Sequence, residues 1–137
     1  MGFFHLNTPG SMLEKAKREL ARLETETSSD HIYNFFVTAY HIVDTLPEPP
    51  RGAILGEPLI QYCGDACNKA KHMQLTRNRP DVTTPTRHYA FIGTPNAVDF
   101  VERFIVWRDG TSLEAISFAR SVIAKWDELF LKHGLGV

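Results

Sequence analysis

Residues 31–45 constrain the fold more than any other part of the chain. The apolar side chains of this stretch cover well over half the circumference of an α-helix, as expected of a helix that other elements contact on several sides. They are Ile32, Phe35, Phe36, Ala39, Tyr40, Ile42 and Val43, with Leu46 directly after the stretch. Residues 27–30 supply N-cap candidates, and the proline-rich residues 47–50 end the helix. We therefore predict a central helix around which the other elements pack.

Three further stretches have the spacing of amphipathic helices. Residues 11–23 begin with a possible Ser11–Glu14 capping box, and residues 58–75 begin with a proline that suits the first turn of a helix. Residues 111–133 begin with a similar Thr111–Glu114 pair and end before Gly134, a typical C-terminal stop. We predict that each of these helices packs through one apolar stripe.

The region between the last two helices favours β-strands. Residues 88–92 and 98–107 are rich in β-branched and aromatic residues and flank a Gly-Thr-Pro-Asn stretch. We predict a β-hairpin near residues 87–108; the alternative is a short helix over residues 94–104, because the apolar spacing there fits either period. Residues 76–86 are predicted to form a loop. The predicted fold is therefore mainly α, a small bundle of about four helices with a β-hairpin before the C-terminal helix.

Length and charge limit the functions that we consider. With 137 residues and a mass of 15.5 kDa, the chain has the size of one domain, which we assign to residues 11–137 after an N-terminal arm of residues 1–10. Fifteen Lys and Arg against sixteen Asp and Glu leave a formal charge of −1, so the molecule as a whole attracts nucleic acid only weakly. Two cysteines, no basic and apolar leader and no long apolar run predict a cytoplasmic protein without a membrane partner.

Two narrow polar strips interrupt the apolar surfaces of the second and third predicted helices. The strip within residues 31–45 has the spacing i, i+3, i+7, i+10, which confines it to an arc of about 80°. Its members are His31, Asn34, Thr38 and His41. The strip within residues 58–75 has the spacing i, i+3, i+7, and its members are Asp65, Asn68 and His72. If the two helices are antiparallel neighbours, we expect the strips to meet and form a hydrogen-bonded network.

Three interpretations of these strips remain open. In the first, the network is structural and fixes the register of the two helices. In the second, it is a general acid–base cleft in which Asp65 holds the pKa of His41 or His72 near neutrality. In the third, it binds a metal ion, with His31, His41, His72 and either Asp65 or Asp44 as candidate ligands. Because no close pair such as His-x-x-x-His fixes the geometry of a metal site, we predict neither a metal nor another cofactor.

The segment of residues 69–88 is basic although the chain as a whole is not. It holds five Lys and Arg against a single acid, Asp81. The basic residues are Lys69, Lys71, Arg77, Arg79 and Arg87. Tyr89 and Phe91 follow directly, and aromatic side chains beside cations are typical of surfaces on which bases stack. The segment is therefore a candidate RNA contact, with solvated surface and core aromatics as the alternative.

Cys63 and Cys67 lie one helical turn apart, on or beside the apolar stripe of residues 58–75. This position favours two small buried thiols over a redox pair or zinc ligands. No second cysteine pair is present to complete a zinc site.

Residues 30–44 (DHIYNFFVTAYHIVD) and 63–72 (CGDACNKAKH) resemble a group of uncharacterised bacterial proteins that are similar to HEPN-type helical domains. The resemblance implies a compact helical bundle that dimerises and, in many such proteins, cleaves RNA without a metal in toxin–antitoxin or phage-defence systems. The nuclease signature of these domains, an Arg followed by four to six residues and a His, does not occur in this sequence. A nuclease here would use a different set of residues, namely His41, Asp65, Asn68, Lys71 and His72.

Two hypotheses about function follow. The first is an accessory or interaction domain, homodimeric through an exposed apolar edge, whose strips are structural or bind a small polar partner. Its candidate binding residues are His31, Asn34, Thr38, Arg77, Arg79 and Arg87. The second is a ribonuclease in which His41 or His72 acts as general acid or base, Asp65 orients it and Lys71 holds phosphate.

Overall fold

The computed structural model describes residues 3–71, 81–89 and 100–136. Within these ranges the chain forms four long helices, one short helix, a 3₁₀ turn and four short strands. In chain order they are α1 (Pro9–Thr25), α2 (Ser29–His41), η1 (Ile42–Thr45), α3 (Pro50–Leu55), α4 (Pro58–Lys71), β1 (Val82–Thr83), β2 (Thr86–Tyr89), β3 (Phe100–Trp107), β4 (Ser112–Glu114) and α5 (Ala115–His133). The prediction of a mainly α bundle with a β-hairpin before the C-terminal helix is confirmed.

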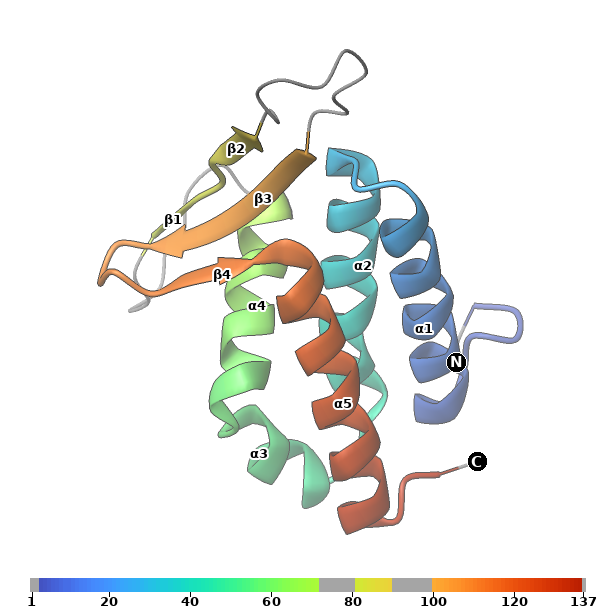
Figure 1. Ribbon diagram of the computed structural model, residues 1–137. Helices are drawn as coiled ribbons and strands as arrows, with labels where there is room; N and C mark the ends of the chain where they lie inside the picture. The colour runs from blue at the N-terminus through green and yellow to red at the C-terminus, as the bar shows by residue number, and fades with distance from the viewer. Residues whose placement is uncertain (1–2, 72–80, 90–99, 137) are drawn as a thin grey trace.

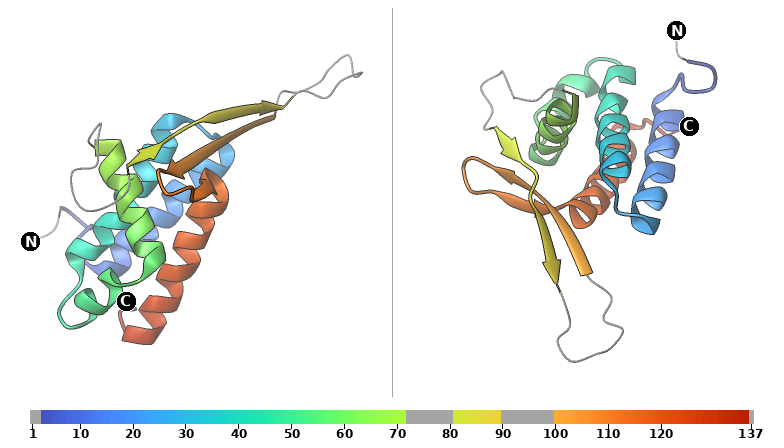
Figure 2. Two further views of the ribbon diagram at one scale, coloured as in Figure 1. Left: turned by 90° about the vertical axis from the view of Figure 1, so that its left-hand side faces the viewer. Right: turned by 90° about the horizontal axis from the view of Figure 1, so that it is seen from above.

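Helix α2 is the central helix of the bundle, as its sequence predicts. It lies between α1 and α4, runs antiparallel to both, and is crossed by α5 (Figures 1 and 2). Phe35, Phe36 and Ala39 of α2 are almost completely buried by these neighbours. The extensive apolar surface of α2 is therefore explained by contacts on three sides.

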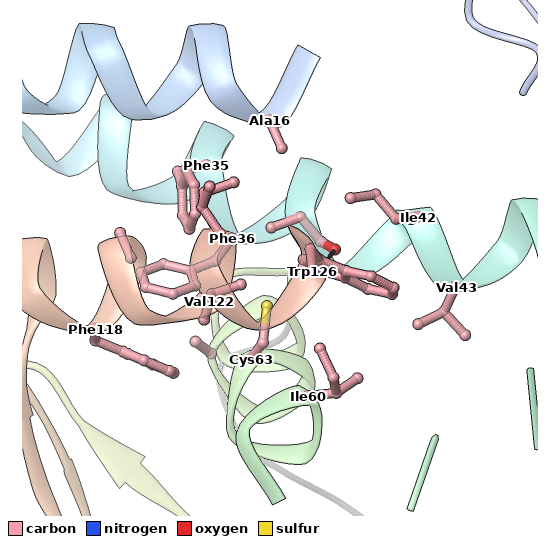
Figure 3. Packing of buried hydrophobic residues seen from close by; sticks show 14 of the residues in the cluster. Ala16, Phe35, Phe36, Ile42, Val43, Ile60, Cys63, Phe118, Val122 and Trp126 are labelled. Atoms are coloured by element: carbon pink, nitrogen blue, oxygen red, sulfur yellow. Dashed lines mark hydrogen bonds between the residues drawn. The ribbon is translucent and has the colours of Figure 1, made fainter. Parts of the chain in front are cut away.

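The core is one cluster of apolar side chains drawn from the four long helices and the sheet. Figure 3 shows Phe36 of α2, Cys63 of α4 and Phe118 of α5 among the side chains of this cluster. The rings of Phe36 and Phe118 have their centroids 4.8 Å apart. The indole Nε1 of Trp126, on α5, donates a hydrogen bond of 3.0 Å to the carbonyl oxygen of Ala39. Ala39 lies in the last turn of α2, and this bond gives its buried carbonyl oxygen a donor from α5.

Strand β3 is the centre of a small antiparallel sheet at the end of the bundle where α4 ends and α5 begins (Figure 1). Strands β1 and β2 pair with β3 in succession, with Val82 opposite Trp107 and Thr86 opposite Arg103. Strand β4 pairs with the other edge of β3 after a tight turn. Gly110 in this turn has a φ of +98°, which explains why a glycine follows Asp109. The β2–β3 pair projects beyond the helices (Figure 2).

The two predicted capping boxes are wrong. Helix α1 begins at Pro9 because Thr8, the residue before it, is the N-cap. The Thr8 hydroxyl accepts from the backbone N–H of Ser11, and the Ser11 hydroxyl accepts from the backbone N–H of Thr8. Helix α5 begins at Ala115 because residues 112–114 pair with β3 as a strand. Glu114 is therefore itself the N-cap, and its side chain accepts from the backbone N–H of Ser117 at 2.7 Å.

Other boundaries also differ from the sequence prediction. Residues 42–45 tighten from α-helix into a 3₁₀ turn, and α3 forms where only a connector is predicted. Val82 and Thr83, in the predicted loop, pair with β3. The helical alternative for residues 94–104 is wrong for residues 100–104, which are strand, whereas residues 94–99 and the predicted helical residues 72–75 lie outside the described ranges.

Replacement of Trp126 tests the link between α5 and α2. We expect Trp126→Phe to lower the free energy of unfolding by about 1 to 3 kcal/mol, because the Ala39 carbonyl loses its donor in a buried site. Denaturant unfolding measures the change. Leu131→Ala is the matched control on the same helix: Leu131 is 87% exposed, and its loss should change stability by less than about 0.5 kcal/mol. Equal stability of the Trp126 variant and the parent protein would contradict the role assigned to this bond.

Candidate functional site

Two members of the polar strip of α2, His31 and Thr38, lie beside α1 and its C-terminal end. Thr38 is buried, and its Oγ1 accepts a hydrogen bond of 2.8 Å from Nζ of Lys15 in α1. The His31 side chain is partly buried, and its Nε2 lies 3.6 Å from a carboxylate oxygen of Glu26, the residue after α1. Asn34 is exposed to solvent. The described contacts of His31 and Thr38 are therefore with α1 and the residue after it.

Asp65, the first member of the polar strip of α4, faces the sheet. Asp65 is 97% buried, and its Oδ2 accepts a hydrogen bond of 2.9 Å from the indole Nε1 of Trp107 on β3. Asn68 is exposed, and His72 lies outside the described residues. Asp65 thus holds an indole group of the sheet. Its predicted pairing with His72 stays a prediction.

The contact between α2 and α4 is a close approach of a ring to a helix backbone. The aromatic ring of Tyr40 lies over Gly64, and a Cβ atom added at Gly64 would be 2.6 Å from Cε1 of that ring. Only glycine leaves room for this packing. The described partners of Thr38 and Asp65 lie in α1 and β3. The network between the two strips stays a prediction, because His72 is outside the described residues.

His41 and Lys71 are the members of the predicted catalytic set that approach one another across α2 and α4. The Nζ atom of Lys71 lies 3.3 Å from Nε2 of His41, which accepts this hydrogen bond when the imidazole is neutral and protonated on Nδ1. A carboxylate oxygen of Asp44 lies 3.9 Å from the same Nε2. The pair is at the surface, and exposed Asn68 lies one helical turn before Lys71. A partial cluster of the predicted catalytic residues therefore exists, in solvent and without Asp65.

The predicted RNA-contacting segment is only partly described. Nζ of Lys69 lies 3.3 Å from Oδ1 of Asp81, so the single acid of the segment neutralises one of its cations. Arg77, Arg79 and the side chain of Arg87 lie outside the described part of the structure. The RNA contact stays a prediction.

Cys63 and Cys67 are both buried and unpaired with each other. Burial raises the pKa of the Cys63 thiol well above its ordinary value, and the neighbouring Cys67 and Asp65 add to this effect. Burial also raises the pKa of Cys67, against a smaller lowering effect of Lys71. Both thiols are therefore protonated at neutral pH, which is typical of structural cysteines and not of nucleophiles.

The described residues form neither a metal-binding cluster nor a membrane span. Among them, no three His, Cys, Asp or Glu side chains gather closely enough to hold a metal ion. Nor does any helix of this part combine the length and apolarity that a membrane crossing requires. His72, one of the ligands considered from the sequence, is not among these residues.

A cavity of about 440 Å³ lies between the N-terminal end of α2, the C-terminal end of α4 and the sheet. Much of its described lining is apolar and comes from all three of these elements. This part of the lining includes Ile32, Phe36, Ala66, Val82, Ile105 and Ala115. The polar lining includes the hydroxyl groups of Ser29, Thr84 and Thr86 and the cationic side chains of Lys69 and Arg103.

Arg103 is the charged residue of the described lining that the sequence interpretation missed. Arg103 precedes buried Ile105 by two residues and buried Trp107 by four, so all three share one face of β3. The Arg103 side chain therefore lies on the face of the strand that is turned toward the bundle. Its Nε donates to the carbonyl oxygen of Thr27 at 2.8 Å, and one terminal nitrogen donates to Oγ1 of Thr86 at 3.3 Å. The sequence signal for this arginine is its spacing: in a strand, every second residue faces the same side, and Arg103 is in step with Ile105 and Trp107.

A scan against protein-family models and searches of curated proteins and of solved structures give no match for this chain. The resemblance to HEPN-type domains, the homodimer and the RNA contact therefore stay predictions.

Replacement of Asp65 separates a structural from a catalytic role. We expect Asp65→Ala to lower the free energy of unfolding by about 1 to 3 kcal/mol, because the buried Trp107 indole loses its acceptor. Asp65→Asn retains an acceptor oxygen and should cost less. Asn68→Ala, an exposed change on the same helix, should stay within about 0.5 kcal/mol of the parent protein. If denaturant unfolding shows no loss for Asp65→Ala, the structural role is wrong.

Proposed function

We propose that this protein is an accessory binding domain that holds a small molecule in the cavity between α2, α4 and the sheet. The observation that carries this proposal is the cavity itself. Its volume of about 440 Å³ falls within the range of roughly 300 to 1,000 Å³ that is usual for small-molecule sites. An apolar lining with a few polar groups is also the usual composition of such sites.

The positions of the polar strips support a binding domain over an enzyme. Thr38 and Asp65 are buried with partners from α1 and β3, so each has a structural role. In this proposal the strips orient the helices and the sheet, and the cavity that these elements enclose does the binding. The proposal retains the accessory or interaction domain expected from the sequence, with a different set of binding residues.

A matched pair of cavity variants tests the proposal. We expect the neutral fluorescent probe phenylnaphthylamine to bind the parent protein saturably at one site, because the cavity removes its apolar surface from water. Ala70→Phe should abolish this binding, since Ala70 lines the cavity from an exposed position on α4 and a larger side chain there fills the space. Ala124→Phe, an exposed change on α5, is the control and should leave binding intact.

Two outcomes of this titration would contradict the proposal. One is the absence of saturable binding by the parent protein. The other is equal binding by the parent protein and the Ala70 variant, which would place the probe elsewhere on the surface. Circular dichroism of both variants establishes that they fold.

The second candidate function is the metal-independent ribonuclease. It is favoured by the 3.3 Å approach of Lys71 Nζ to His41 Nε2, which places a cation able to hold phosphate beside a group able to transfer a proton. Under this proposal the purified protein cleaves RNA in the presence of a metal chelator. His41→Ala should abolish cleavage while leaving the melting temperature close to that of the parent protein, because His41 is at the surface. Absence of cleavage by the parent protein, or cleavage that His41→Ala leaves intact, would exclude this candidate.

A further inference from the structure

We infer that the cavity selects an organic anion, a small molecule with an apolar body and one acidic group that Arg103 binds. The inference rests on the binding function proposed above and specifies its ligand class. Its first support is charge: the described lining holds two cations, Lys69 and Arg103, and no Asp or Glu. An acidic group brought into such a site gains a favourable interaction that a neutral group of the same shape does not.

The two cations of the cavity differ in how they are compensated. Lys69 forms an ion pair with Asp81 at 3.3 Å. The hydrogen bonds of Arg103 go to two neutral acceptors, the carbonyl oxygen of Thr27 and the hydroxyl of Thr86. Within the described ranges no carboxylate lies within 4 Å of the Arg103 guanidinium. Arg103 therefore carries the charge that a bound anion would neutralise.

The geometry of Arg103 suits recognition of an acidic group. A guanidinium has five N–H donors, and the two bonds to Thr27 and Thr86 leave others for a ligand. These bonds also fix the side chain in place, so little conformational entropy is lost when an anion binds. A planar guanidinium held in this way pairs with the two oxygens of a carboxylate, or with a sulfonate or phosphate, through parallel hydrogen bonds.

The N-terminal end of α2 lies at this end of the cavity, with the exposed acid Asp30 in its first turn. Thr27 immediately precedes the N-cap Ser28, and Ser29, the first residue of α2, lines the cavity. The N-terminal end of a helix carries a partial positive charge. The bond from Arg103 to Thr27 places the guanidinium beside this end, so the two effects act on the same ligand group.

The remaining lining indicates the size and polarity of the rest of the ligand. Ile32, Phe36 and Ile105 present apolar surface, and the cavity volume of about 440 Å³ limits the ligand to a small molecule. A polymer such as RNA does not fit this description. The expected ligand is thus an aromatic or aliphatic acid and not a sugar, a metal ion or a nucleic acid.

The test compares two probes that differ only in one acidic group. Anilinonaphthalene sulfonate is phenylnaphthylamine with a sulfonate added. We expect the parent protein to bind the sulfonate more tightly, and we expect Arg103→Gln to weaken binding of the sulfonate about tenfold or more, the scale of a lost charged hydrogen bond. Binding of the neutral probe should not change. Arg120→Gln, at an exposed arginine on α5 that pairs with Glu24, is the control and should affect neither probe.

A second measurement does not depend on the folding of any variant. In the parent protein, added salt should weaken binding of the sulfonate and leave binding of the neutral probe unchanged. If both probes bind equally, with no effect of salt or of Arg103→Gln, the inference about an anion is overturned while the binding function stands. If neither probe binds saturably, the binding function and this inference both fail.

Discussion

The hydrogen bond between Asp65 and Trp107 is the interaction on which the arrangement of sheet and bundle depends. A buried carboxylate is costly without a partner, and here the indole of β3 donates to it at 2.9 Å. The same indole ring contacts the rings of Tyr62 and Phe118, with centroids 4.9 and 5.9 Å away. One residue of β3 thus joins α4 and α5, and it fixes where the sheet crosses the end of the helices.

The cavity follows from this anchoring point. Trp107 and Ile105 are buried where β3 meets the helices, whereas the β2–β3 pair continues beyond them (Figure 2). Between these two regions, the sheet and the ends of α2 and α4 border the cavity. Arg103 lines it from the face of β3 that also carries Ile105 and Trp107. Arg103 links β3 to the residue before the N-cap of α2 and to β2 through its bonds to Thr27 and Thr86.

Local sequence patterns predict much of the fold. They fail where a structural feature depends on a residue far away in the sequence. The all-round apolar surface of α2, the turn at Gly110 and the helix stop at Gly134 follow from the residues themselves. A helical period defines which residues share a face, but it does not say which neighbour that face meets. Asp65 therefore belongs correctly to a polar strip, and its partner, Trp107, lies 42 residues further along the chain. For this reason the period of α4 alone does not locate the cavity beside the sheet.

Hydrogen exchange of the two tryptophan indole N–H groups tests the central claim most directly. The chain has only two tryptophans, so a Trp107→Phe variant assigns both resonances. The account predicts that the Trp107 indole proton exchanges only when the whole protein unfolds, at a rate close to that of the Trp126 indole. Rapid exchange of the Trp107 proton beside a protected Trp126 proton would show that the sheet opens independently of the bundle, and it would contradict the anchoring role of Asp65.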